Sequence, residues 1–170
     1  MNHLTINNNL RISTIWECNA LLADYQMYYQ KIRDFHRYIG NNKQNDLHDR
    51  FEQLYNQAKT NIDSLAERIA DIQDEPVSGY RELKKITSIE RGLLPQTDEE
   101  MIKEIIRDHA VILDRMKSIR NNTTITGDEK TKDLIQSYIN EIKKSSVTLA
   151  TWSKRPKMHL ETVSLNFNKQ

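Results

Sequence analysis

The chain has 170 residues, a formal net charge of +1, 37% hydrophobic residues and 29% charged residues. This length fits a single domain with its own core. No apolar run approaches the length of about 20 residues that crosses a bilayer, which excludes a membrane-spanning protein. The single Cys18 excludes a disulfide framework, and residues 1–9 lack a signal-peptide pattern. A cytoplasmic protein is therefore expected.

Long stretches without proline or glycine favour helices, since the chain has only three prolines and four glycines. Apolar residues recur at three- and four-residue steps in four of these stretches. The third long helix is predicted to open at a capping box formed by Thr97 and Glu100, and a polar link is expected at 121–127. The helices are predicted at 10–39, 46–73, 97–120 and 128–154, with a short one at 80–85.

These elements predict an all-α fold, a four-helix bundle with a short extra helix between the second and third long helices. The bundle is expected to occupy residues 10–154. Residues 1–9 form a polar N-terminal tail and residues 155–170 a C-terminal tail in this division. Gly40 and the polar residues after it predict a short connection, which makes the first two helices antiparallel neighbours. His36 would then face His48 across that connection.

Two pairs of metal-ligating residue types are spaced four apart on the second helix, namely His48 with Glu52 and Asp63 with Glu67. Each pair shares a helix face. His48 and Asp63 are separated by about 22 Å of helix, at about 1.5 Å per residue. One ion, with bonds of about 2 Å, cannot bind both ends. Either there are two half-sites in one chain, or a two-fold dimer joins the ends of two antiparallel chains.

The same stretch resembles the Dps family of mini-ferritins, which are ferritin-like bundles. The matching elements are a helix that ends in His and Gly, then Leu-His, Phe-Glu and Asp-x-x-x-Glu-Arg. They stand here as His36 and Gly40, 47–48, 51–52 and 63–68. Weaker similarity continues through Pro76, Tyr80, 88–89, 127–134 and Trp152, so that the resemblance covers roughly 15–154.

The resemblance implies an iron-oxidising and iron-storing protein, a ferroxidase, that assembles from two-fold dimers into a hollow homo-dodecamer. Iron would bind His36, His48 and Glu52 from one subunit and Asp63 and Glu67 from the other, with peroxide or dioxygen as oxidant. Asp128 and Asp133 match acids that line the pore through which iron enters. No further cofactor is expected.

Three positions depart from the family pattern. Arg37 replaces the tryptophan that usually follows the first histidine, which puts the handling of peroxide and radicals in doubt. Gly40 falls one position early. Ser137 stands where a third pore acid is expected, which puts the cation attraction of the pore in doubt.

Simpler interpretations exist for single residues. Histidines at the edge of an apolar stripe are usually packed residues, and acids at four-residue spacing usually face solvent. His109 is expected to be buried or at the boundary of the core, and His3 and His159 carry no spacing signal.

Two other functions remain open. One is a nucleoid DNA-binding structural protein with a vestigial metal site, and the other is a helical adaptor. DNA binding is expected to be weak or absent, since residues 1–13 contain no lysine and only Arg11. A modest basic cluster lies near the C-terminus, at Lys154, Arg155, Lys157 and Lys169.

Overall fold

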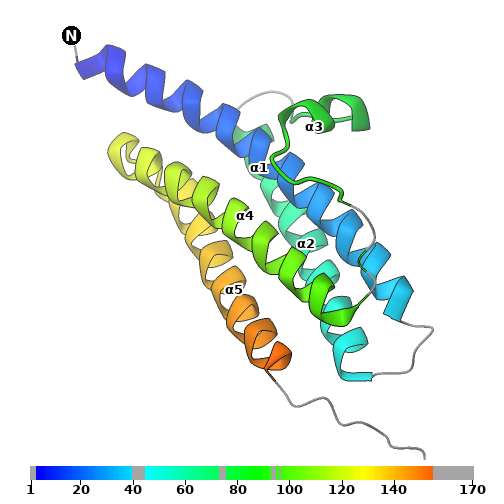
Figure 1. The fold of residues 1–170 in the computed structure, drawn as a ribbon. Coiled ribbons are helices and arrows are strands. Elements are labelled where there is room, and N and C mark those ends of the chain that lie inside the picture. Colours follow the sequence, from blue (N-terminus) through cyan, green and yellow to red (C-terminus); the bar gives the residue numbers. More distant parts are fainter. Residues whose placement is uncertain (1–2, 40–44, 73–75, 93–94, 96, 155–170) are drawn as a thin grey trace, which may run out of the picture.

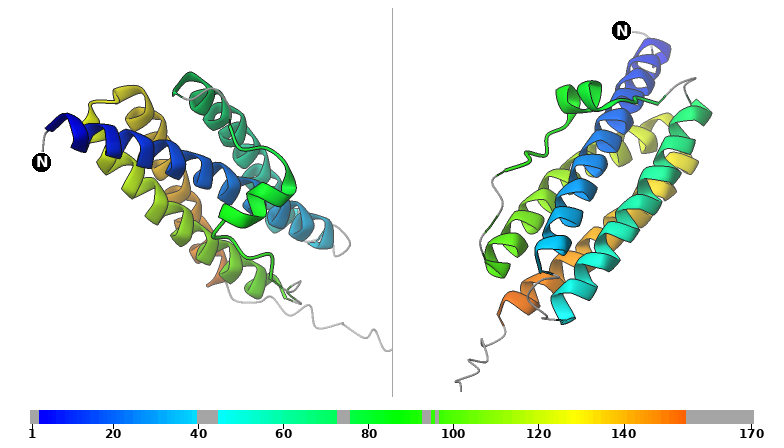
Figure 2. Two further views of the ribbon diagram at one scale, coloured as in Figure 1. Left: turned by 90° about the horizontal axis from the view of Figure 1, so that it is seen from above. Right: turned by 90° about the vertical axis from the view of Figure 1, so that its right-hand side faces the viewer.

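Four long helices form an antiparallel bundle in the computed structural model, which describes residues 3–39, 45–72, 76–92, 95 and 97–154 (Figure 1). α1 packs against α2 and α4, and α4 packs against α5. A short helix, α3, lies outside the bundle against α1 (Figure 2). The predicted fold class is confirmed. The helices are α1 (His3–Ile39), α2 (Asn45–Ile72), α3 (Tyr80–Ile86), α4 (Asp98–Thr126) and α5 (Glu129–Ser153).

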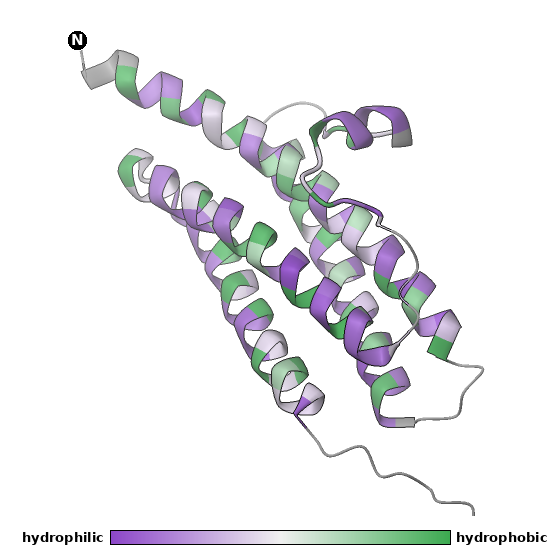
Figure 3. Ribbon diagram, viewed as in Figure 1, coloured by the Kyte–Doolittle hydropathy of each residue, from purple (hydrophilic) through white to green (hydrophobic). Residues whose placement is uncertain are grey.

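The core forms because each long helix has one apolar stripe, and burying that stripe is the main favourable term in folding. Hydrophobic and hydrophilic residues accordingly alternate along the ribbons in Figure 3. The largest side chains that are almost fully buried include Tyr25, Tyr28, Phe51, Leu65 and Met101. Phe35 and Phe51 pack ring to ring, with centroids 6.2 Å apart, and join α1 to α2 just below the connection between them.

Two helix boundaries differ from the prediction. α1 begins at His3 instead of residue 10, so most of the segment assigned to the N-terminal tail is helical. α4 continues to Thr126, and the polar link predicted at 121–127 is wrong except for Gly127, which caps the helix with φ 74°. Thr123 is buried, and the hydroxyls of Thr124 and Thr126 donate to carbonyls of the preceding turn. These local hydrogen bonds let a polar sequence remain helical.

The capping box at the start of α4 is confirmed. The backbone N–H of Glu100 donates to the Thr97 hydroxyl, and the backbone N–H of Thr97 donates to the Glu100 carboxylate, both at 3.2 Å. The segment after α3 is anchored by the buried Asp24. This carboxylate accepts from the backbone N–H of Ser88 at 2.6 Å and from Arg115 Nε at 2.7 Å. The segment between α3 and α4 is thereby held against α1.

Two predicted core residues lie in the core. Cys18 is fully buried, and burial raises the pKa of its thiol to about 12. His109 is 1% exposed, and its two ring nitrogens contact the Tyr28 hydroxyl at 2.6 Å and the Ser146 hydroxyl at 2.7 Å. His109 is thus a satisfied core histidine. In the part of the chain that the structure describes, no helix is both long and apolar enough to span a membrane.

Candidate metal centre

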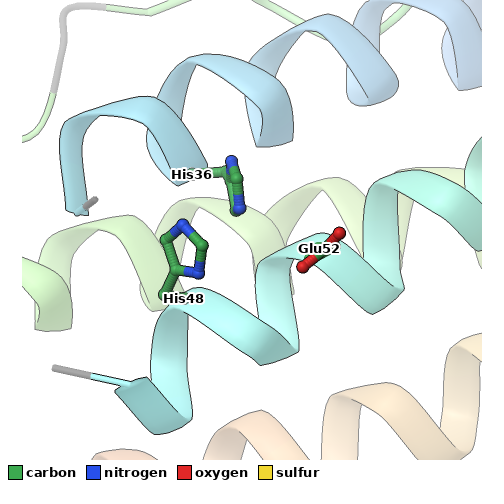
Figure 4. A group of neighbouring side chains, drawn as sticks. All are labelled: His36, His48 and Glu52. Carbon is green, nitrogen blue, oxygen red and sulfur yellow. The ribbon is translucent and has the colours of Figure 1, made fainter. Parts of the chain in front are cut away.

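Three predicted ligands meet where α1 ends and α2 begins. His36 lies in the last turn of α1, and the short connection turns the chain so that the first turns of α2 bring His48 and Glu52 opposite it (Figure 4). One ligand atom from each of the three lies within 4.8 Å of the others. Ligands of one transition-metal ion lie at most about 4 Å apart, given bonds of about 2 Å. Small side-chain rotations would therefore suffice to close the set around an ion.

The two imidazoles face one another, with ring centroids 3.9 Å apart and planes inclined by 37°. Nε2 of His36 is buried and has no hydrogen-bond partner among the described residues. Burial lowers the pKa of His36, and the neighbouring His48 lowers it further. The ring is consequently neutral at neutral pH, with a nitrogen lone pair available to a metal. An unpaired buried nitrogen is costly in a purely structural role and is expected of a ligand.

The chemistry of this ligand set suits a transition metal. Two neutral imidazoles and one carboxylate are the donors that hold Fe(II) in non-haem sites, and they leave coordination positions open. Glu52 is exposed, whereas the two histidines are half-buried, so an ion would be reached from the Glu52 side. The set can therefore bind a divalent cation and leave room for a small oxidant.

Asp63 and Glu67 lie elsewhere. Both are exposed on α2, with Asp63 about four and Glu67 about five helical turns beyond His48 at 3.6 residues per turn. They are not among the residues that this chain brings together as a candidate metal cluster. Within the described part of one chain, Asp63 and Glu67 therefore do not join the cluster of His36, His48 and Glu52. Whether they form a separate half-site or complete the site of a second chain is still open at this point.

The two predicted pore acids differ in their surroundings. Asp133 is exposed on α5, and so is Ser137. Asp128 caps the N-terminus of α5, where its carboxylate accepts from Thr131 and from Arg68 Nη2. Burial raises the pKa of Asp128, but the hydrogen bonds from Thr131 and the charge of Arg68 outweigh it and lower the pKa below its usual value. Its negative charge is thus already paired within the chain.

Tyr55 also contacts this cluster, although it was not predicted as a residue of the site. Its ring contacts the His36 ring edge to face, with centroids 5.2 Å apart, and its hydroxyl donates to Glu52 Oε1 at 3.5 Å. The signal was present, because Tyr55 follows Glu52 by three residues and His48 by seven and so shares their helix face. Arg37, in contrast, points to solvent and pairs with Asp34.

Most of the chain is similar to proteins of one known family. The family profile described as a ferritin-like domain matches residues 17–158. A DNA protection during starvation protein 2 of Bacillus anthracis is 32% identical over 126 residues, 74% of this chain and 86% of the relative. The chain belongs to the Dps family of ferritin-like proteins.

Further relatives cover most of the chain. General stress protein 20U of Bacillus subtilis is 28% identical over 79% of this chain and 92% of its own length. The crystal structure of the Dps protein of Vibrio cholerae O1 superposes with a TM-score of 0.79 at 28% identity, over 88% of this chain and 92% of that one. That protein is described as a member of a superfamily of ferritin-like diiron-carboxylate proteins. Dps of Thermosynechococcus elongatus shares the fold, with a TM-score of 0.81 at 22% identity and coverage of 91% and 98%.

Proposed function

We propose that this Dps-family protein is a ferroxidase that oxidises Fe(II) with peroxide or dioxygen and stores the ferric product. The observation that carries the proposal is the convergence of His36, His48 and Glu52 around one point, with Nε2 of His36 buried and unpaired. Iron is here the substrate. Neutral imidazoles favour Fe(II), and the hard carboxylate oxygens suit the Fe(III) that is formed.

The chain's residues have three tasks in this reaction. The two imidazoles hold the incoming ion at the helix connection. The Glu52 carboxylate contributes negative charge that balances the extra positive charge of the ferric state. The open positions admit the oxidant beside the ion, so the reactants are held together before the electron moves.

The second half of the site is proposed to come from a two-fold mate. Asp63 and Glu67 are exposed and lie about 22 Å and about 28 Å of helix from His48, a separation that antiparallel pairing of two α2 helices would cancel. Two identical sites would then form per dimer. We propose that such dimers assemble into a hollow dodecamer whose interior holds the ferric mineral.

Large apolar side chains on the outside of the described chain support assembly. Ile12 and Trp16 on α1, together with Val147 on α5, are between 57% and 68% exposed. Burial of such side chains between subunits stabilises an oligomer. Asp133 is the better candidate for attracting cations at a pore, because the charge of Asp128 is paired with Arg68.

DNA binding is proposed to be weak or absent, although several relatives are named for DNA protection during starvation. Nonspecific DNA binding needs clustered cations. Residues 1–13 contain no lysine, and Arg11 is the one arginine among them. The basic C-terminal cluster begins at Lys154, and its remaining members lie outside the described residues.

The test is ferric absorbance after Fe(II) and hydrogen peroxide are added to the purified protein. The double variant His36→Ala, His48→Ala is expected to lose rapid oxidation and to keep its helix content, because both side chains lie at helix ends outside the main core. Gln53→Ala, at the exposed neighbour of Glu52, is the matched control and should oxidise iron at the normal rate. Unchanged oxidation in the double variant would refute the proposal.

A further inference from the structure

A row of aromatic rings leads away from the candidate iron site. It starts at His36, whose ring meets Tyr55 edge to face at 5.2 Å. Tyr55 in turn meets Tyr29 edge to face, with centroids 6.3 Å apart. These separations lie in the range of direct aromatic contact. An oxidisable phenol is therefore one van der Waals contact from an iron ligand.

Reduction of hydrogen peroxide requires more electrons than one Fe(II) supplies, and a nearby phenol could supply the difference. The ligand set of one chain would hold one Fe(II), which supplies one electron on oxidation. Reduction of hydrogen peroxide to hydroxide and water needs two. If the second electron is missing, the O–O bond breaks to give a free hydroxyl radical. A second donor beside the ion prevents this whenever only one ion is bound.

We propose that Tyr55 is this second electron donor, an inference that rests on the proposed ferroxidase function. Fe(II) gives one electron, and the Tyr55 phenol gives one electron and its proton. The O–O bond of hydrogen peroxide breaks, and the products are Fe(III), hydroxide, water and a neutral Tyr55 radical. A second Fe(II) then reduces the radical, and the phenol regains its proton from water with release of hydroxide. The sum is two Fe(II) oxidised per peroxide and no free radical.

The surroundings of Tyr29 keep the radical on Tyr55. The Arg33 guanidinium lies over the Tyr29 ring, with Cζ 5.5 Å from the centroid. A cation held against a ring face attracts its electrons and makes the ring harder to oxidise. The Arg33 charge also acts on Tyr55, but no cation stacks on the Tyr55 ring among the described residues, and the Tyr55 hydroxyl faces the Glu52 carboxylate. The electron is consequently drawn from the ring nearest the iron.

Two other oxidisable rings lie at this end of the bundle among the described residues. Tyr38, two residues after His36 on α1, is 42% exposed. Trp152 of α5 lines a surface pocket together with Asp49 and Arg50 of α2. Trp16, in the first half of α1, lies about 30 Å of helix from His36 at about 1.5 Å per residue. Tyr38 and Trp152 are therefore the competing donors that an experiment has to distinguish from Tyr55.

The experiment uses the full-length assembled protein, Fe(II) at less than one ion per site, and excess hydrogen peroxide. The sample is frozen rapidly and examined by electron paramagnetic resonance, while ferric absorbance is followed in parallel. The wild-type protein is expected to show a tyrosyl radical. Tyr55→Phe should lose that signal, still form ferric iron, and release hydroxyl radical to a spin trap. Tyr29→Phe, which removes the neighbouring hydroxyl in the same row, is the matched control and should keep the signal.

The outcomes separate this inference from the proposed function. If no ferric absorbance develops in the wild-type protein, the proposed ferroxidase function fails, and the electron-donor role fails with it. If ferric iron forms but the radical persists in Tyr55→Phe, the inference alone is overturned. A tryptophan-type signal that disappears in Trp152→Phe would assign the role to Trp152 instead. Retained helix content and oligomer size establish that each variant is folded.

Discussion

The Arg68 guanidinium donates a hydrogen bond of 2.8 Å to the carboxylate of Asp128, and this pair joins the second half of α2 to the residue that caps α5. Arg68 Nε also donates to the Thr131 hydroxyl at 2.8 Å. A half-buried ion pair therefore links the C-terminal half of α2 to the N-terminus of α5. A residue that resembles a pore acid in sequence thus has a structural role in this chain.

This contact predicts that Asp128→Ala destabilises the protein. The variant loses the helix cap, worth about 1 kcal/mol, and leaves Arg68 with only the longer ion pair to Asp71, at 3.6 Å. Thermal unfolding at fixed protein concentration should show a lowered Tm. Asp133→Ala, an exposed acid on the same helix, is the control and should leave Tm unchanged.

The pH dependence of this contact has a definite sign. The pKa of Asp128 is lower in the folded state than its ordinary value of 3.8. The stabilisation of the folded state by the ionised Asp128 is therefore complete at neutral pH. It is lost as the pH falls below 3.8 through the folded pKa. Equal Tm values for the wild-type protein and Asp128→Ala at neutral pH would contradict the assignment.

His109 predicts a loss of stability in weak acid. Burial lowers its pKa from 6.5 to about 4, so the folded protein holds it neutral while the unfolded chain takes up a proton. His109 does not lower the free energy of unfolding above pH 6.5. Between pH 6.5 and 4 its titration lowers that free energy by about 1.4 kcal/mol for each unit by which the pH falls. Denaturant unfolding at several pH values measures this slope.

The control for this prediction is His109→Gln, which removes the titrating group. The adjacent Asp108 acts in the opposite direction, because burial raises its pKa to about 6 although the Lys31 ammonium opposes the shift. The difference between the wild-type protein and His109→Gln isolates the histidine. A difference that does not change between pH 7 and pH 4.5 would show that His109 is not held neutral.

The proposed sharing of a site between chains predicts complementation. A His36→Ala, His48→Ala variant lacks one ligand set, and an Asp63→Asn, Glu67→Gln variant lacks the other. A mixed dimer has one site with every native ligand and one site that keeps only Glu52. Co-assembly should therefore raise the iron oxidation rate above that of either parent. Verified mixed dimers that show no recovery would mean that each chain's ligands act alone.

Duplex DNA is predicted to show no retardation at physiological salt and neutral pH. Binding that appears at low salt should disappear when the chain is truncated after Ser153, because this removes Lys154, Arg155, Lys157 and Lys169 together. Electrostatic binding of this kind weakens steeply as salt rises. Gel retardation over a range of salt concentrations is the measurement. Tight binding that survives the truncation would favour the nucleoid function.

Local features were predictable from the sequence alone. The helical pattern, the capping box at Thr97 and the shared face of His48 and Glu52 all depend on residues within one or two turns. The short connection after α1 was enough to predict that His36 would face His48, because two helices joined this closely can only be antiparallel neighbours. The extra helical turns at 3–9 and 121–126 were missed, since these polar segments carry no clear apolar periodicity. At 123–126 the threonine hydroxyls donate to backbone carbonyls of the same helix.

Only the tertiary structure decided which helix faces meet. Arg68 and Asp128 are 60 residues apart, and the hydrogen bond between Tyr28 and His109 spans 81 residues. The hydrophobic period states which side of a helix is buried, but it contains no information on the axial register or rotation of two packed helices. The ionic fastening of α2 to α5, the neutral buried His109 and the contact of Tyr29 with Tyr55 all depend on that register. The sequence by itself determined the bundle and the three residues of the candidate metal centre, and packing decided the partners of the remaining polar and aromatic side chains.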